Sequence, residues 1–219
     1  MTILQQLHLS RLVRGVGDYA EGTACLVSAA VALWRFRHGA PLGVATSELD
    51  CICPVIRSFC ITINDAPFWE NDQQRTKVLG EYVHQILNTK ASEEIEIRRA
   101  FLCADFAIRK FAPLGLRASG LNQEAAELET LPPIIDKGTA AAAAHTARDA
   151  AAAYAASGTA RDAAAAYAFA ATRNLSSTIY AAYAANAASA VYGTKETNVV
   201  LLIQQLLNTM IACKGEANL

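Results

Sequence analysis

The chain has 219 residues, hydrophobic residues at 53% of its positions and a formal net charge of −1 at pH 7. A chain of this length and composition can bury a substantial core, either as one domain or as two closely packed halves. The small net charge and the lack of a basic stripe argue against a general nucleic-acid binder, because such a protein needs a basic face to attract phosphates.

The sequence also bears on location in the cell. Residues 1–8 lack the positive and apolar regions of a secretory signal peptide. The most apolar run, residues 23–34, is shorter than the roughly 20 residues that span a bilayer, and Arg35 and Arg37 follow it. We therefore expect a cytoplasmic protein with no membrane partner. In that compartment the six cysteines are expected to be reduced, most of them buried as small hydrophobes.

The N-terminal third is predicted to be helical. Apolar residues at helical spacing predict helices over residues 3–14 and 19–38, the second of them apolar on nearly all sides between residues 24 and 34. Residues 41–48 are predicted to form a loop. Helical spacing returns over residues 55–63, where β-branched residues leave a strand as the alternative.

Capping patterns predict the next helices. Asn71 with Gln74 resembles a capping box, opening a helix whose apolar face continues to Leu87. Ser92 is predicted to cap the following helix, which ends at residues 112–115, and a short helix follows over 121–131. The Pro132-Pro133 pair then marks the best internal boundary. It divides the chain into an N-terminal helical part, 1–131, and an alanine-rich part, 132–219, packed on it, unless both form one domain.

Residues 138–192 are mostly alanine, the residue with the highest helix propensity. A block running from Thr146 to Ala155 recurs thirteen residues later, and Ser157-Gly158-Thr159 separates the two copies. Glycine at such a position typically ends a helix. We expect helices over 139–157, 159–174, 177–191 and 195–213. The predicted fold class is all-α, a bundle of about nine to eleven helices with an alanine-rich, closely packed C-terminal half.

Two groups of residues are candidates for a ligand or partner site. The first gathers polar residues and one tryptophan near predicted helix ends: Asp50, Asn64, Asp65, Trp69, Asp72 and Arg75. Converging helix ends would give a concave site with polar groups and an aromatic wall. The alternative is that these residues are helix caps and turn formers. The second group lies in the repeats and consists of Arg148, Tyr154, Arg161 and Tyr167. The tyrosines would line a groove between alanine helices and the arginines would link adjacent helices, with core packing or self-association as the alternative.

Other chemistry has less support. Cys51-x-Cys53 with Cys60 could supply thiolates to a metal, but no second pair accompanies it, and buried thiols are the preferred interpretation. Asp105 is expected to pair with Arg109, four residues further on. None of the four histidines lies in a motif with a nucleophile or a metal-binding spacing. We therefore predict no catalytic residue, no metal and no cofactor.

Five short stretches carry a resemblance: Thr23-Ala-Cys-Leu-Val-Ser-Ala-Ala, Asp50-Cys-Ile-Cys-Pro-Val-Ile, Asn64-Asp-Ala-Pro, Arg75-Thr and Leu131-Pro-Pro-Ile. With these and its alanine-rich second half, the chain resembles uncharacterised bacterial and phage proteins with alanine-rich all-α C-terminal halves. Some proteins of that kind are labelled immunity proteins. The resemblance implies a microbial or viral source and supplies no catalytic residues.

Taken together, these patterns predict a non-catalytic binding protein that neutralises or sequesters a partner, of the immunity or counter-defence type. It is expected to bind a protein or to form a homo-oligomer through its alanine-rich helices. Two alternatives remain open. One is a small-molecule binder that sequesters a metabolite or a nucleotide-derived signal. The other is an all-α hydrolase that uses Asp50, Asp65 and Asp72.

Overall fold

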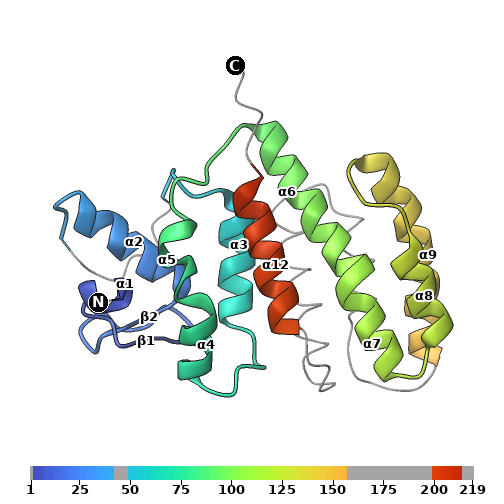
Figure 1. Ribbon diagram of the computed structural model, residues 1–219, viewed down its shortest axis with the longest axis horizontal. Coiled ribbons are helices and arrows are strands. Elements are labelled where there is room, and N and C mark those ends of the chain that lie inside the picture. Colours follow the sequence, from blue (N-terminus) through green and yellow to red (C-terminus); the bar gives the residue numbers. More distant parts are fainter. Residues whose placement is uncertain (1, 42–48, 157–198, 214–219) are drawn as a thin grey trace.

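The computed structural model describes residues 2–41, 49–156 and 199–213, and these residues are mostly helical, as the predicted all-α class requires (Figure 1). The helices are α1 (Ile3–Gln6), α2 (Leu26–Arg37), α3 (Pro54–Asn64), α4 (Asp72–Leu79), α5 (Tyr82–Gln85), α6 (Glu93–Phe106), the π-helix η1 (Ala107–Phe111), α7 (Ala112–Ala118), α8 (Asn122–Thr130), α9 (Lys137–Ala156) and α12 (Val199–Ala212). The helices predicted over 159–174 and 177–191 lie outside the described residues. No described helix is long and apolar enough to cross a membrane.

The first predicted helix is wrong beyond its first turn. α1 ends at Gln6, and His8 takes a left-handed backbone conformation with φ of 56°. The chain then extends, and β1 (Arg11–Leu12) pairs in parallel with β2 (Thr23–Ala24). Leu7, Leu9 and Leu12 are all buried, so the apolar spacing that suggested a helix arises from an extended segment packed on the core.

The second predicted helix begins seven residues later than expected, at Leu26 instead of residue 19. A loop over residues 13–22 takes its place. Gly17 lies in that loop with φ of 82°, and a Cβ there would come within 2.5 Å of the Ala24 Cα. The close approach of these two backbones therefore requires glycine. Cys25 caps α2, because its Sγ accepts a hydrogen bond from the Ser28 N–H at 3.3 Å.

The helix predicted over residues 55–63 is confirmed as α3, so the strand alternative is wrong. Asn71 caps the next helix as expected, because its side chain accepts from the Gln74 N–H at 2.8 Å, while the Gln74 side chain accepts from the Glu70 N–H at 2.9 Å, one residue before the capping-box position. The helix that begins there does not continue to Leu87. It breaks at Gly80 into α4, which packs beside β1, and α5, which packs beside α2. α4 and α5 pack against different elements, and a single straight helix could not contact both of them.

The predicted end of the next helix is also wrong. α6 begins after Ser92 as expected, although the Ser92 side chain makes no capping hydrogen bond. The chain then passes through η1 into α7 and stays helical to Ala118, so the three segments form one long rod (Figure 1). Proline has no N–H to donate and its ring crowds the preceding turn. The wider π-helical turn before Pro113 accommodates it without ending the helix.

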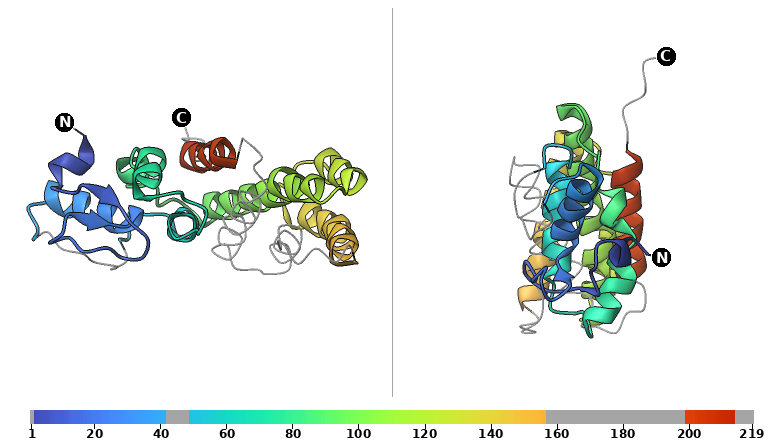
Figure 2. Two further views of the ribbon diagram at one scale, coloured as in Figure 1. Left: turned by 90° about the horizontal axis from the view of Figure 1, so that it is seen from below. Right: turned by 90° about the vertical axis from the view of Figure 1, so that its left-hand side faces the viewer.

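The short helix predicted over 121–131 is confirmed as α8, and α9 packs against it. α9 begins at Lys137, two residues before the predicted start, because Asp136 caps it: the Asp136 Oδ1 accepts from the Thr139 N–H at 2.7 Å. Its buried alanines recur at helical spacing along one stripe: Ala140, Ala143, Ala147 and Ala150. Figure 2 shows α9 and α12 on opposite sides of the rod formed by α6, η1 and α7.

The last predicted helix is confirmed over the described residues as α12, which packs on α6 and α3. Its buried face consists of Val199, Ile203, Leu206, Leu207 and Met210. A second contact joins the same two parts of the chain, because the Asp105 Oδ1 accepts the Ile134 N–H at 2.9 Å. Both contacts cross the predicted boundary at Pro132-Pro133, and the division into parts 1–131 and 132–219 stays a prediction.

A buried arginine holds the end of α12. Arg99, on α6, is 2% exposed. Its Nε donates to the Met210 carbonyl and its Nη2 to the Cys213 carbonyl, both at 2.8 Å, while Nη1 donates to the Thr89 carbonyl. The last carbonyls of a helix have no partner within the helix and carry partial negative charge. The Arg99 guanidinium donates hydrogen bonds to these carbonyls, and their partial negative charge compensates its positive charge.

Replacing Arg99 by methionine should lower the free energy of unfolding by about 3 kcal/mol, because the carbonyls at the end of α12 would be buried without donors. Urea denaturation followed by circular dichroism measures the loss. Its neighbour Arg98 is a matched control, since it is exposed and its ion pair among the described residues is with Glu94, four residues earlier. Arg98→Met should change the stability by less than about 0.5 kcal/mol. Equal effects of the two substitutions would contradict this account.

Candidate functional site

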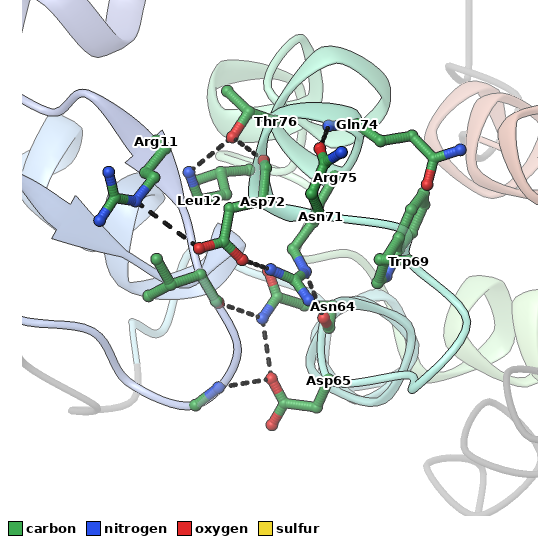
Figure 3. A network of polar contacts seen from close by, with 12 residues as sticks. Arg11, Leu12, Asn64, Asp65, Trp69, Asn71, Asp72, Gln74, Arg75 and Thr76 are labelled. Atoms are coloured by element: carbon green, nitrogen blue, oxygen red, sulfur yellow. Dashed lines mark hydrogen bonds and ion pairs between the residues drawn. The ribbon is translucent and has the colours of Figure 1, made fainter.

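All residues of the first candidate group except Asp50 lie around the C-terminal end of α3, between the loop after β1 and the start of α4 (Figure 3). We call this cluster the polar junction and define it by Arg11, Asn64, Asp65, Asp72, Arg75 and Thr76. Each of these side chains bonds to a segment other than its own or to another member of the cluster. The polar junction therefore joins parts of the chain that are distant in sequence.

Asn64 lies at the centre of the polar junction and is fully buried. Its Oδ1 accepts from the Leu26 N–H at 3.1 Å, and its Nδ2 donates to the Val13 carbonyl at 2.9 Å and to the Asp65 Oδ1 at 2.8 Å. Leu26 is the first residue of α2, where backbone N–H groups have no partner within the helix. The amide thus satisfies a helix start and a loop carbonyl together, which an apolar side chain cannot do.

Asp65 extends these contacts to the glycine-containing loop. Its Oδ1 accepts from the Gly15 N–H at 2.9 Å as well as from Asn64. Gly15 has a positive φ of 71°, a conformation that glycine adopts without strain. The carboxylate therefore fixes the loop against the end of α3 while remaining partly exposed to solvent.

Arg75 connects α3 to α4. It is 5% exposed, its Nε donates to the Asn64 carbonyl at 2.9 Å, and its Nη1 pairs with the Asp72 Oδ1. Arg11 approaches the other oxygen of the same carboxylate, with Nε 3.6 Å from the Asp72 Oδ2. Arg11 is half exposed, so solvent screens that ion pair and it adds little stability. The buried contact of Arg75 is the stronger link.

Two further hydrogen bonds complete the surroundings of the polar junction. The Thr76 hydroxyl accepts from the Leu12 N–H at 2.8 Å and donates to the Asp72 carbonyl at 2.6 Å, so α4 holds the edge of β1. The Trp69 indole N–H donates to the Ile63 carbonyl at 2.8 Å, and the ring is buried. Trp69 is thus a packed core residue with its polar edge satisfied, and not an open aromatic wall.

The structure brings together Asn64, Asp65, Trp69 and Arg75 and separates Asp50 from them. Asp50 is exposed and precedes the N-terminal end of α3, whereas Asn64 is the last residue of that helix, which is about 16 Å long. Arg148 and Tyr154 fall on α9, and Arg161 and Tyr167 lie outside the described residues. The geometry of the polar junction favours the alternative that these residues hold helix ends and turns.

Sequence reasoning missed Arg11 and Thr76 as members of the polar junction. Arg11 falls within the helix that was predicted over residues 3–14, and that helix gave no reason to pair it with α4. Its role depends on the parallel pairing of β1 with β2, and that pairing joins residues twelve positions apart in sequence. No pattern in the sequence identified Thr76 as a contact to another element, because a threonine inside a helix usually forms a hydrogen bond to its own helix.

The expected salt bridge in the core is confirmed. The Arg109 Nη1 lies 2.9 Å from the Asp105 Oδ1, and both side chains are largely buried. The same oxygen accepts the Ile134 N–H, so this carboxylate also anchors the segment between α8 and α9. A buried carboxylate with a cationic and a backbone donor is satisfied without a ligand.

The cysteines divide into two classes. Cys53, Cys60 and Cys103 are fully buried, and Cys25, Cys51 and Cys213 are partly buried. Burial raises the pKa of the Cys60 and Cys103 thiols above the ordinary value, because the thiolate would lose its hydration. The Cys103 Sγ lies 3.4 Å from the Met210 Sδ. Among residues 2–41, 49–156 and 199–213, no three histidine, cysteine or acidic side chains are arranged to hold a metal ion.

Comparison of the chain with family models, with curated proteins and with solved structures found no match.

Asn64 provides a direct test of the polar junction as a structural element. Asn64→Leu keeps the volume but leaves the Leu26 N–H and the Val13 carbonyl without a partner, so the free energy of unfolding should fall by about 2 to 3 kcal/mol. Urea denaturation measures the change. Asn122→Leu is the control, because Asn122 is exposed at the start of α8 and should alter stability by less than about 0.5 kcal/mol. A fully stable Asn64→Leu protein would mean that these hydrogen bonds do not hold the fold together.

The thiol classes predict an order of chemical reactivity. At pH 8 the folded protein should be alkylated by iodoacetamide first at Cys51 and Cys213, while Cys60 and Cys103 stay protected, because the thiolate is the reactive form and burial disfavours it. Peptide mass spectrometry after timed reaction gives the order. In urea all six cysteines should react at similar rates. Early labelling of Cys60 in the folded protein would contradict the buried assignment.

Proposed function

We propose that this chain is a non-catalytic binding protein that neutralises or sequesters a macromolecular partner, as immunity and counter-defence proteins do. The observation that carries the proposal is the internal use of the polar junction. The groups of Asn64, Asp65 and Arg75 that would hold a small ligand are bonded to one another and to the backbone. Recognition then falls to the outer surface of the helical scaffold.

The described residues include exposed apolar side chains that are suited to such recognition. Three large apolar side chains in separate parts of the chain are more than half exposed, namely Phe36 at 51%, Ile135 at 67% and Leu201 at 61%. Single exposed apolar residues are common on soluble proteins, but aromatic residues and arginine are enriched in protein interfaces. Phe36 is such an aromatic residue next to arginines, because Arg35 and Arg37 flank it in the sequence.

Self-association through the alanine-rich part belongs to the same proposal. On α9, the stripe from Ala140 to Ala150 is buried against the fold, and Ala141 and Ala142 are exposed on the other side. Small side chains let two helix backbones approach closely. A second copy of the chain could therefore pack on the outer side of α9.

Native mass spectrometry of freshly purified protein, compared with its denatured mass, tests the proposed function. A partner protein or a second copy should be retained in the native spectrum and released on denaturation. An added mass of a few hundred daltons per chain would instead support the alternative of a small-molecule binder. An empty monomer that also retains no partner in a pull-down from its host would refute the proposal.

A further inference from the structure

The end of α2 differs from the rest of that helix in its exposure. From Leu26 to Leu33 every residue is buried, and Leu33 is 1% exposed. Within the next turn Phe36 is 51% exposed, and Arg37 and His38 are exposed as well. The last turn thus extends beyond the helices that surround α2, and Figure 1 shows it at the outer edge of the molecule.

The exposed turn alternates aromatic and basic residues. We call the five residues Trp34, Arg35, Phe36, Arg37 and His38 the α2 tip. The sequence contains no aspartate or glutamate between residues 25 and 41. Among the described parts of the chain, neither Arg35 nor Arg37 forms an ion pair. The α2 tip therefore carries positive charge without internal neutralisation, on a protein whose net charge is −1.

Part of the α2 tip is held in place before any partner arrives. The rings of Trp34 and His38 stack with their centroids 4.2 Å apart and their planes at 24°. The His38 Nδ1 lies 2.7 Å from the Trp34 carbonyl, which fixes the imidazole against the end of the helix. An ordered aromatic pair loses little conformational entropy on binding, and this favours affinity.

We propose that the α2 tip is a docking site for an acidic surface of a protein partner. Arg35 and Arg37 would receive carboxylates, and Phe36 between them would enter an apolar depression among those carboxylates. Arginine and aromatic residues together are the composition of interface hot spots, and the unneutralised charge selects an acidic partner. This inference rests on the proposed function and names the surface and the partner chemistry that it would use.

Other anionic partners fit the α2 tip less well. A nucleic-acid binder needs basic residues along an extended face, and here they occupy one helical turn. An interfacial membrane helix needs a long apolar face with basic residues beside it, whereas α2 is enclosed by protein up to Leu33. A single turn with one protruding aromatic residue matches a local acidic site on a protein.

The two tryptophans of the chain allow the α2 tip to be observed directly in the intact protein. Trp34 belongs to the α2 tip, while the Trp69 indole is buried and hydrogen-bonded to Ile63. In a nitrogen-15 spectrum the two indole signals are assigned by Trp34→Phe. Titration with a short synthetic peptide in which glutamate alternates with leucine should shift the Trp34 signal and leave that of Trp69 in place. Added salt should weaken the binding, because it screens exposed charges.

Two pairs of variants give the test its controls. Arg37→Glu should weaken peptide binding about tenfold, because it replaces an attraction by a repulsion, whereas the same reversal at exposed Lys110 on η1 should have little effect. Phe36→Ala should weaken binding, and Ile135→Ala, at a more exposed site elsewhere, should not. Thermal unfolding of all four variants should match the unaltered protein, since each side chain is exposed.

The outcomes separate this inference from the proposed function. Failure of the acidic peptide to shift the Trp34 signal would overturn the inference. Equal losses with Arg37→Glu and Lys110→Glu would do the same, as would binding only to a single-stranded oligonucleotide or to vesicles of phosphatidylserine and phosphatidylcholine. If native mass spectrometry finds a protein partner that Arg37→Glu and Phe36→Ala retain as well as the controls do, the proposed function stands and the α2 tip is not its binding site.

Discussion

The fold depends on a buried cation that has no acidic partner among its contacts. Arg99 donates to carbonyls of Thr89, Met210 and Cys213, and so connects residues more than 110 positions apart. A charge removed from water is costly unless it is fully hydrogen-bonded. The negative end of α12 supplies both the acceptors and a compensating potential. α12 closes the core only if its C-terminal end lies at this point, so Arg99 sets the position of the whole helix along α6.

α3 links the contacts of Arg99 to the part of the molecule that contains α2 and β1. Thr89 bonds to Arg99 through its carbonyl, and its hydroxyl accepts the Cys53 N–H at 3.1 Å, just before α3 begins. At its other end, α3 presents Asn64 to the start of α2 and to the loop after β1. Each end of one eleven-residue helix is therefore fixed by buried hydrogen bonds. Arg99 and Asn64, together with Thr89, thus link the ends of α2, α3 and α12 to α6.

Local signals in the sequence predicted most helices and few of their connections. α3, α8 and α12 were predicted because an apolar stripe, a cap or a proline pair identifies each of them from neighbouring residues alone. The errors arose where a contact between residues far apart in sequence determines the local structure. Leu7, Leu9 and Leu12 are buried by a parallel strand pairing that no local pattern encodes. Pro113 usually ends a helix, and η1 removes the clash. Asn64 and Arg75 were recognised as polar residues near helix ends, but their burial became apparent only from the fold.

Burial also separates the polar residues by role. Three polar side chains are each at most 5% exposed, namely Asn64, Arg75 and Arg99. The hydrogen bonds that each forms within the chain outnumber those that a ligand could form with it. A partner that took these groups would have to open the core first. Arg37 and His38 are exposed and Arg35 is partly exposed, at the end of a helix whose buried part ends at Leu33. Their charge contributes nothing to the contacts that hold the described fold together. Because binding there needs no rearrangement of the core, the end of α2 is the surface where an acidic partner could bind most readily.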